Sequence, residues 1–308
     1  MSYLAGLTVR LAAGAMQFAD DFRRRHAAYL AAAQQEDGGF PGREGPADLY
    51  YTGFGLRGLA LLDALDETAA ARAAGFLQAR LAEAMPGIDF LSLAFSAVLL
   101  EAVAGIDVFA AGGLDRRDAV LQGTEPLRRE DGGYAKAESS ARSSTYQTFL
   151  VIACRQLVGL PIEDAGRISA MIRSRQRGDG GFVELDRLPQ SGTNPTAAAI
   201  GLLRLLGALD ESTRTAAARF LAGMQGAEGG FLANTRIPLA DLLSTFTALV
   251  ALDDLDALGS VDLGAVRRYA AALELPEGGF LAGAWDDQGD VEYNFYGLGA
   301  MAMLYAAE

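Results

Sequence analysis

The chain has very few of the side chains that bind transition metals or form covalent cross-links. Its 308 residues include one cysteine, Cys154, and one histidine, His26. A single cysteine excludes a disulfide within the chain, and one cysteine with one histidine is too few for a zinc site built from nitrogen and sulfur ligands. Cys154 stands in an apolar segment, where the expected role of a cysteine is that of a small buried side chain.

Positive charge and long apolar runs are also scarce. Twenty-six basic residues face thirty-nine acidic ones, a net charge of −13, which disfavours nucleic acid and anionic membranes as partners. The apolar runs 56–65 and 197–209 fall short of the roughly 20 residues of a membrane span. Residues 1–16 lack a basic segment ahead of their apolar part, so we expect a first helix there and not a signal peptide. These observations predict a protein without a membrane span and with a cytoplasmic location.

What the sequence does contain is one short motif in five copies: an acid, two glycines and an aromatic residue. The copies are 37–40, 131–134, 179–182, 228–231 and 277–280. Their second glycines stand at 39, 133, 181, 230 and 279, so the last four repeat every 48 or 49 residues. The first interval is about twice as long, which predicts a sixth, degenerate copy near Pro86. Repeats of this length indicate a stacked or closed array of supersecondary units.

Each motif is followed by a polar loop, an apolar helix, a short turn and an amphipathic helix. Apolar helices are expected at 48–65, 89–105, 144–159, 193–209, 241–252 and 290–307. Amphipathic helices are expected at 67–81, 113–129, 161–176, 211–225 and 261–275, with Pro161 in a first helical turn. Helices that are apolar on nearly all sides must be buried, whereas the amphipathic ones need one polar surface.

The prediction is therefore an all-α fold, an α6-α6 toroid barrel of about six helix pairs with a central cavity and no convincing strand. It forms one domain over residues 1–308, in which the helices of 1–35 complete the barrel. The glycine pairs allow positive φ and a tight return from outer to inner helix. The repeats start near Gly38, Pro86, Gly132, Gly180, Gly229 and Gly278.

The succession of Gln or Arg-Gln, an acid, Gly-Gly-Phe, a polar loop and an Asp-led apolar helix resembles the prenyltransferase and squalene-oxidase repeat over residues 26–307. Proteins with this repeat include the triterpene cyclases and the protein prenyltransferase β subunits, and the β subunits are the more similar. The resemblance implies a funnel-shaped apolar cavity that holds an isoprenoid.

The resemblance also shows which of the family's chemical groups are missing. The β subunits bind catalytic zinc through Asp, Cys and His, and these positions fall on Asp241, Leu243 and Tyr293. Only the aspartate is retained, which argues against zinc-activated thiolate alkylation. The Asp-x-Asp-Asp motif with which cyclases protonate an alkene has no copy at the apolar-helix starts. The acidic cluster 253–256 follows an apolar helix, and we interpret it as a solvated turn.

The N-terminal ends of the apolar helices should converge on one rim of the barrel. Asp48, Asp89, Asp241 and Asp290 stand there and have two interpretations. Each could be an N-cap that accepts backbone N–H groups, or one could be a general acid or base whose pKa is raised in a partly desolvated funnel. The candidate catalytic residues are Asp241, Asp290 and Tyr293.

The candidate substrate-binding residues are arginines and aromatic or amide side chains of the same rim. The arginines could hold a diphosphate or form salt bridges between repeats, and the aromatic residues could line the cavity or pack between the helical layers. The run 23–26, three arginines and His26, is expected on the solvated face of an outer helix. The proposed substrate-binding set is Arg142, Arg236, Tyr50, Tyr51, Tyr146, Asn194, Trp285 and Tyr296.

The leading hypothesis is an isoprenoid-binding or isoprenoid-diphosphate-binding protein that acts as a zinc-independent prenyl transferase or terpene cyclase. The alternative is a non-catalytic toroid that binds a lipid or a partner protein. We expect no zinc, whereas Mg²⁺ held by carboxylates stays open. The expected partner is an isoprenoid or another lipid-like small molecule, and a protein partner or a homodimer is implied by the resemblance alone.

Overall fold

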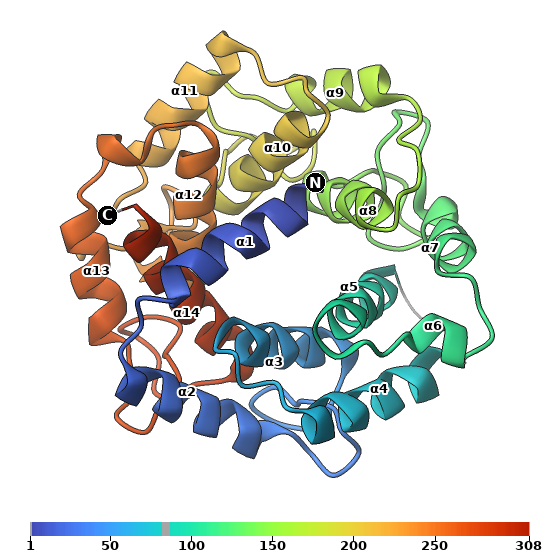
Figure 1. The fold of residues 1–308 in the computed structure, drawn as a ribbon. Coiled ribbons are helices and arrows are strands. Elements are labelled where there is room, and N and C mark those ends of the chain that lie inside the picture. The colour runs from blue at the N-terminus through green and yellow to red at the C-terminus, as the bar shows by residue number, and fades with distance from the viewer. Residues whose placement is uncertain (1, 82–86, 308) are drawn as a thin grey trace.

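Two concentric rings of α-helices make up the protein (Figure 1). The computed structural model describes residues 2–81 and 87–307. The inner ring consists of α3 (Leu49–Leu61), α5 (Gly87–Ala104), α8 (Thr145–Leu157), α10 (Thr193–Leu205), α12 (Leu242–Asp254) and α14 (Val291–Ala306). The outer ring consists of α2 (Asp20–Ala33), α4 (Glu67–Leu81), α7 (Arg116–Thr124), α9 (Ala165–Ser174), α11 (Glu211–Ala222) and α13 (Leu263–Ala272). Because α14 packs against α3, the inner ring is closed, and the predicted all-α toroid barrel is confirmed.

The helices differ from the prediction mainly at their ends. The single helix expected at 113–129 consists of α7 followed by the 3₁₀ helix η1 (Glu125–Leu127), and an additional short helix, α6 (Val108–Ala111), precedes it. A second 3₁₀ helix, η2 (Leu258–Ser260), precedes α13. Asp164 has a φ of 55°, outside the range of a right-handed helix, and α9 begins after it. Pro161 therefore precedes the helix, and its expected place in a first turn is wrong.

The acid-Gly-Gly-aromatic motif forms the turn from an outer helix into the next inner helix. A Cβ on the second glycine would be too close to a neighbour, as at Gly230, where it would lie 2.4 Å from the Tyr269 ring. The aromatic residue is buried, and the backbone N–H of Phe231 donates to Thr245 Oγ1 at 3.0 Å. The first glycine has a left-handed φ between 87° and 99°, which favours a residue without Cβ, at Gly38, Gly132, Gly180, Gly229 and Gly278.

The same turns contain short β-structure that the sequence did not predict. Strand β1 (Phe231–Leu232) pairs with antiparallel β2 (Ala240–Asp241). Three equivalent turns contain a single bridge between the motif aromatic and the residue before the inner helix, for example Tyr134 with Ser144. The expectation of no strand is thus wrong for one pair of two-residue strands. The sixth motif copy, predicted near Pro86, lies outside the described residues.

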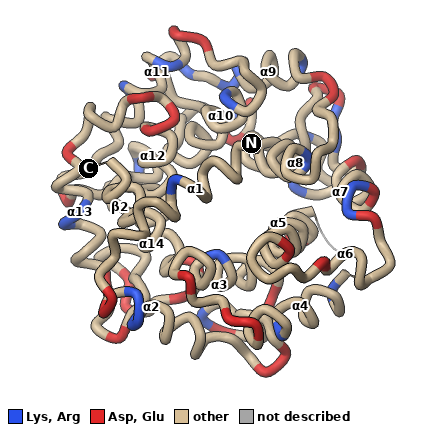
Figure 2. Tube along the Cα trace, viewed as in Figure 1, with Lys and Arg blue, Asp and Glu red and all other residues tan. Residues whose placement is uncertain are grey.

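The two rings differ in polarity as the repeat pattern predicts. Charged residues lie mostly on the outer helices and on the loops between helices (Figure 2). Helix α5 is long and apolar enough, by length and composition alone, to cross a membrane, and it exceeds the two apolar runs considered in the sequence. Here it forms the wall of the inner ring between α3 and α8. A helix enclosed by protein on most sides has the same composition.

Helix α1 (Tyr3–Ala15) lies across one end of the ring, where the inner helices have their C-terminal ends (Figure 1). A Cβ on Gly14 would lie 1.8 Å from the carbonyl oxygen of Ala302, so α1 and α14 are in backbone contact. The Tyr3 hydroxyl donates to Asp254 Oδ2 at 2.5 Å, and Arg10 donates to Asp254 Oδ1 at 3.1 Å. The Asp254 side chain is fully buried. The predicted solvated turn at 253–256 is therefore wrong at Asp254, because α1 covers it.

His26 also differs from its expected solvated position. It is fully buried on α2, with its ring centroid 4.2 Å from that of Phe22 and 4.9 Å from that of Phe280. Its Nδ1 accepts the backbone N–H of Gly279 at 3.1 Å. Burial lowers its pKa, so the imidazole is a neutral part of the last Gly-Gly-Phe turn.

Candidate functional site

The region between the inner faces of the six inner helices is here called the lumen, and the N-terminal ends of these helices form its rim. Three of the four predicted rim acids, Asp48, Asp241 and Asp290, are N-caps of α3, α12 and α14. Each carboxylate accepts a backbone N–H three residues later, at 2.6 to 2.8 Å. Asp89 lies in the first turn of α5. The N-cap interpretation therefore describes three of these acids, since such caps satisfy N–H groups that the helix leaves unpaired.

Asp290 has a second partner, Arg43, on the loop before α3. Arg43 Nε donates to Asp290 Oδ2 at 2.9 Å, while its two Nη atoms donate to Asp286 at 2.8 and 2.5 Å. The hydrogen bonds that Arg43 donates to Asp286 raise the pKa of Arg43. Both oxygens of the Asp290 carboxylate therefore have a partner, one in the N-cap and one in the ion pair. The sequence did not indicate Arg43 as this partner. An acid–base role for Asp290 stays a prediction.

Asp241 is more enclosed. Its carboxylate accepts the backbone N–H of Ser244 at 2.6 Å and the Ser244 hydroxyl at 2.9 Å. Burial raises the pKa of Asp241 despite these bonds. Burial, together with the nearby charges of Glu292 and Asp241, raises the pKa of Tyr293 to about 12, so this phenol is neutral at physiological pH. Asp241 and Tyr293, two of the three candidate catalytic residues, are thus electrostatic neighbours at the rim.

The predicted diphosphate-binding arginines lie on exposed loops. Arg142 Nη1 donates to Asp186 at 2.7 Å, and both side chains are more than half exposed. Arg236 is exposed and has no ion-pair partner among residues 2–81 and 87–307. Trp285, on the last loop, is 55% exposed. All three side chains are exposed, and no contact joins them among the described residues.

Glu292, which the sequence analysis did not select, stands in the first turn of α14. Its Oε1 accepts the Tyr50 hydroxyl at 2.6 Å and the Tyr296 hydroxyl at 3.3 Å. Burial raises the pKa of this carboxyl. Burial and the Glu292 charge in turn raise the pKa of Tyr50, so the phenol remains a hydrogen-bond donor. The lumen therefore contains a carboxyl that two tyrosines orient.

Arg57 is the second unpredicted group. Its guanidinium carbon lies 4.3 Å from the centroid of the Phe54 ring and 4.7 Å from that of Phe295. Both rings are buried on inner helices, yet Arg57 itself is exposed. The surface that Arg57 exposes is therefore inside the lumen, not on the outside of the protein. Burial lowers its pKa, and the nearby tyrosines and Glu292 act in the opposite direction.

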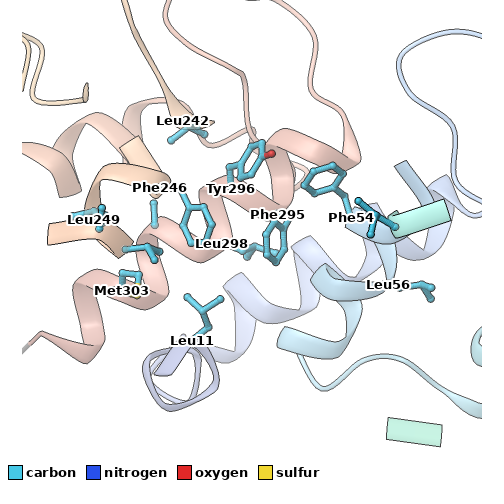
Figure 3. Packing of buried hydrophobic residues seen from close by; sticks show 14 of the residues in the cluster. Leu11, Phe54, Leu56, Leu242, Phe246, Leu249, Phe295, Tyr296, Leu298 and Met303 are labelled. Carbon is cyan, nitrogen blue, oxygen red and sulfur yellow. The ribbon is translucent and has the colours of Figure 1, made fainter. Parts of the chain in front are cut away.

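Aromatic rings from three inner helices pack together next to these two groups, and Figure 3 shows Phe54, Phe246, Phe295 and Tyr296 among them. The Phe54 centroid lies 5.2 Å from that of Tyr296 and 5.8 Å from that of Phe295, and Phe246 lies within 6 Å of both α14 rings. On α8, Tyr146 is 39% exposed and close enough to Tyr50 to raise its pKa. The lumen is thus lined by aromatic residues from α3, α8, α12 and α14.

Of the predicted substrate-binding residues, the structure brings Tyr50, Tyr146 and Tyr296 together around Glu292. Tyr51 lies beside them, with its ring centroid 5.4 Å from that of Tyr50. Asn194 lies apart from this group and accepts the Thr247 hydroxyl at 2.7 Å.

A sequence signal for Arg57 existed. Tyr50, Phe54 and Arg57 are spaced i, i+4, i+7 and share one face of an apolar helix, where an arginine is unusual. Glu292 similarly precedes Tyr296 by one helical turn. Its bond to Tyr50, however, joins residues 242 positions apart.

No group of three or more His, Cys, Asp or Glu side chains within residues 2–81 and 87–307 is placed to hold a metal ion. Leu243 and Tyr293 stand where the resemblance places two zinc ligands, and neither side chain is suited to zinc.

Comparison with solved structures shows the same fold in proteins of different chemistry. A protein geranylgeranyltransferase-I of Candida albicans, complexed with GGPP, has a TM-score of 0.73 at 15% identity, covering 91% of this chain and 90% of that one. A variant of the type II terpene cyclase MstE from Scytonema, in complex with geranylgeranyl dihydroxybenzoate, has a TM-score of 0.65 at 14% identity, covering 98% and 99%. An α-1,6-mannanase variant of Salegentibacter sp. HEL1_6 has a TM-score of 0.63 at 14% identity, covering 94% and 99%. At these identities the likeness concerns the fold.

Sequence comparison is more specific about the family. No curated protein sequence matches this chain at a significant level. The family model described as the prenyltransferase alpha-alpha toroid domain matches residues 4–77, 87–232 and 197–308. These matches cover all six inner helices and the outer helices, α4 as far as residue 77, and the chain therefore belongs to the prenyltransferase α/α toroid domain family.

Proposed function

We propose that this protein binds an isoprenoid chain in its lumen and transforms it by proton transfer, without zinc, as a terpene-cyclising enzyme. The observation that carries the proposal is the Glu292 carboxyl, which two tyrosine hydroxyls orient inside an aromatic lumen. Aromatic faces pack well against an unsaturated hydrocarbon and attract positive charge. Burial raises the pKa of Glu292 and so favours the protonated form that a general acid needs.

The reaction balances within the substrate. The Glu292 proton adds to one carbon of an alkene, and the π electrons of a second double bond form a ring C–C bond. A proton then leaves the resulting cation to a base, which regenerates a double bond. Substrate and product are isomers, so neither an oxidant nor a metal is needed.

Cyclisation is better supported than prenyl transfer from a diphosphate. A departing diphosphate requires several positive groups near the reacting carbon. The rim arginines Arg43 and Arg142 are paired with aspartates, and Arg236 lies on an exposed loop. Of these four arginines, Arg57 is the one beside the Phe54 and Phe295 rings. The solved relatives in complex with GGPP and with geranylgeranyl dihydroxybenzoate support an isoprenoid as the ligand. The mannanase likeness shows that the fold alone does not decide this.

The test separates binding from turnover. Purified protein is melted with and without geranylgeraniol, geranylgeranoic acid and geranylgeranyl diphosphate, because a ligand that binds only the folded state raises Tm. The same compounds are then incubated in D₂O with EDTA, and mass spectrometry is used to find an isomeric product that carries one deuterium. Glu292→Gln should abolish this product and keep binding, whereas Glu36→Gln, at an exposed position, should change neither.

Two outcomes would contradict the proposal at different levels. If no isoprenoid raises Tm, the lumen does not bind this class of ligand. If ligands bind but no isotope enters any product, the protein is a carrier or scaffold, which was the alternative hypothesis from the sequence.

A further inference from the structure

Arg57 differs from the other arginines that lie inside the fold. Arg155 is 4% exposed and donates to Thr124 Oγ1 and to Glu125 Oε2. Arg175 is 2% exposed, and both of its Nη groups donate to oxygens of neighbouring residues. The guanidinium groups of Arg155 and Arg175 therefore donate hydrogen bonds to other residues of the protein.

Arg57 uses only one of its three nitrogens. Its Nε donates to the carbonyl oxygen of Gly53 at 2.8 Å, one helical turn earlier. Across the described ranges, 2–81 and 87–307, no acceptor lies within hydrogen-bond distance of Nη1 or Nη2 and no acid is ion-paired with the side chain. The Nε bond holds the guanidinium close to its own helix. The guanidinium carbon lies over the Phe54 and Phe295 rings.

A positive charge in such a place is costly unless a counter-charge compensates it. The carboxylate of Glu292 is held by the tyrosines and does not reach Arg57 as an ion pair. The same charge also opposes the proposed reaction, since a cation on the substrate would be repelled by an uncompensated guanidinium. An anionic group on the ligand would remove both problems.

From this geometry we propose that the ligand carries a carboxylate on its apolar chain and that Nη1 and Nη2 of Arg57 bind this carboxylate inside the lumen. The inference rests on the proposed function and names the class of substrate, an unsaturated isoprenoid acid. Two parallel N–H groups on a planar fork match the two oxygens of a carboxylate. A diphosphate carries more negative charge and would need further cationic side chains. The lumen groups described above include no second one beside Arg57. The alcohol of the same chain would leave the guanidinium uncompensated.

The experiment compares matched ligands on matched variants. The dissociation constants of geranylgeranoic acid, geranylgeraniol and geranylgeranyl diphosphate are measured by calorimetry on wild type, Arg57→Gln, Arg57→Lys and the control Arg117→Gln, at an exposed position of the outer helix α7. Circular dichroism and Tm confirm that each variant is folded. Wild type should bind the acid about 10- to 100-fold more tightly than the alcohol, the range expected for hydrogen bonds to a charged group.

Arg57→Gln should lose this preference while its affinity for the alcohol stays the same. Arg57→Lys should retain part of it, because lysine keeps the charge without the planar fork. Arg117→Gln should behave as wild type. Equal binding of acid and alcohol by wild type, a preference that survives Arg57→Gln, or tighter, Arg57-dependent binding of the diphosphate would each overturn the inference. If none of the three ligands binds, the proposed function itself fails, which is a different result.

Discussion

Replacing Glu292 by glutamine should stabilise the protein above neutral pH while it removes the proposed activity. Burial raises the pKa of Glu292, so ionisation of this carboxyl destabilises the folded state. The stability that the protonated form contributes is fully present below the pKa of the unfolded chain, about 4.3. It is lost as the pH rises through the higher pKa of the folded state. Glutamine cannot ionise, and its amide oxygen can still accept the Tyr50 hydroxyl, which lies 2.6 Å from Oε1 in wild type.

The expected size of the effect follows from the length of the chain. Each unit by which the folded-state pKa of Glu292 exceeds the unfolded value is equivalent to about 1.4 kcal/mol in favour of the variant at high pH. Unfolding entropy is about 2.1 cal/mol/K per residue, which for 308 residues gives about 0.65 kcal/mol per kelvin. One pKa unit should therefore raise the Tm of Glu292→Gln above that of wild type by about 2 °C.

Thermal melts of wild type and variant from about pH 4 to about pH 9 measure this difference. The difference in Tm should be small at the acidic end and grow as the pH rises, whereas Glu36→Gln should show no such growth. A variant that is less stable than wild type throughout, or a difference that does not depend on pH, would show that the Glu292 charge stabilises the fold. The carboxyl would then be a structural group and a poor candidate for the acid.

Two further predictions concern the fold. Gly297→Ala should lower Tm by about 2–5 °C, since its Cβ would lie 2.3 Å from the buried Phe280 ring and overpacking costs about 1–3 kcal/mol. Gly75→Ala, in an exposed helical position with no neighbour within 4 Å, should raise Tm by about 1 °C, and equal shifts in both variants would contradict this packing. Tyr3→Phe removes the donor to the buried Asp254 and should lower Tm by about 2–4 °C and increase hydrogen exchange in α1. Tyr29→Phe is the control, because the Tyr29 hydroxyl forms no hydrogen bond among the described residues. If hydrogen exchange in α1 is unchanged in Tyr3→Phe, the bond from Tyr3 to Asp254 does not hold the helix.

Local chemistry that repeats along the chain could be predicted from the sequence. The glycine pairs, the apolar and amphipathic helices and the acids at the helix starts each depend on residues within about one helical turn, where spacing determines geometry. The closed ring of inner and outer helices followed from these elements. Asp241 and Asp290 were also correctly located at helix N-termini, because an N-cap is a local feature.

The contents of the lumen could not be predicted in this way, because closing the ring brings the first and last repeats together. The Tyr50 hydroxyl meets Glu292, and Arg43 meets Asp290, across sequence separations of 242 and 247 residues. Asp254 is buried only because α1, from the other end of the chain, covers it.

Helical periodicity indicates which face of a helix is apolar, but it carries no information on the neighbour across the ring. The sequence by itself therefore determined the toroid and its turns, since these depend on local spacing. Only the tertiary structure decided which rim acid is both an N-cap and ion-paired, which carboxyl two tyrosines hold, and which lumen arginine has no ion-pair partner among the described residues.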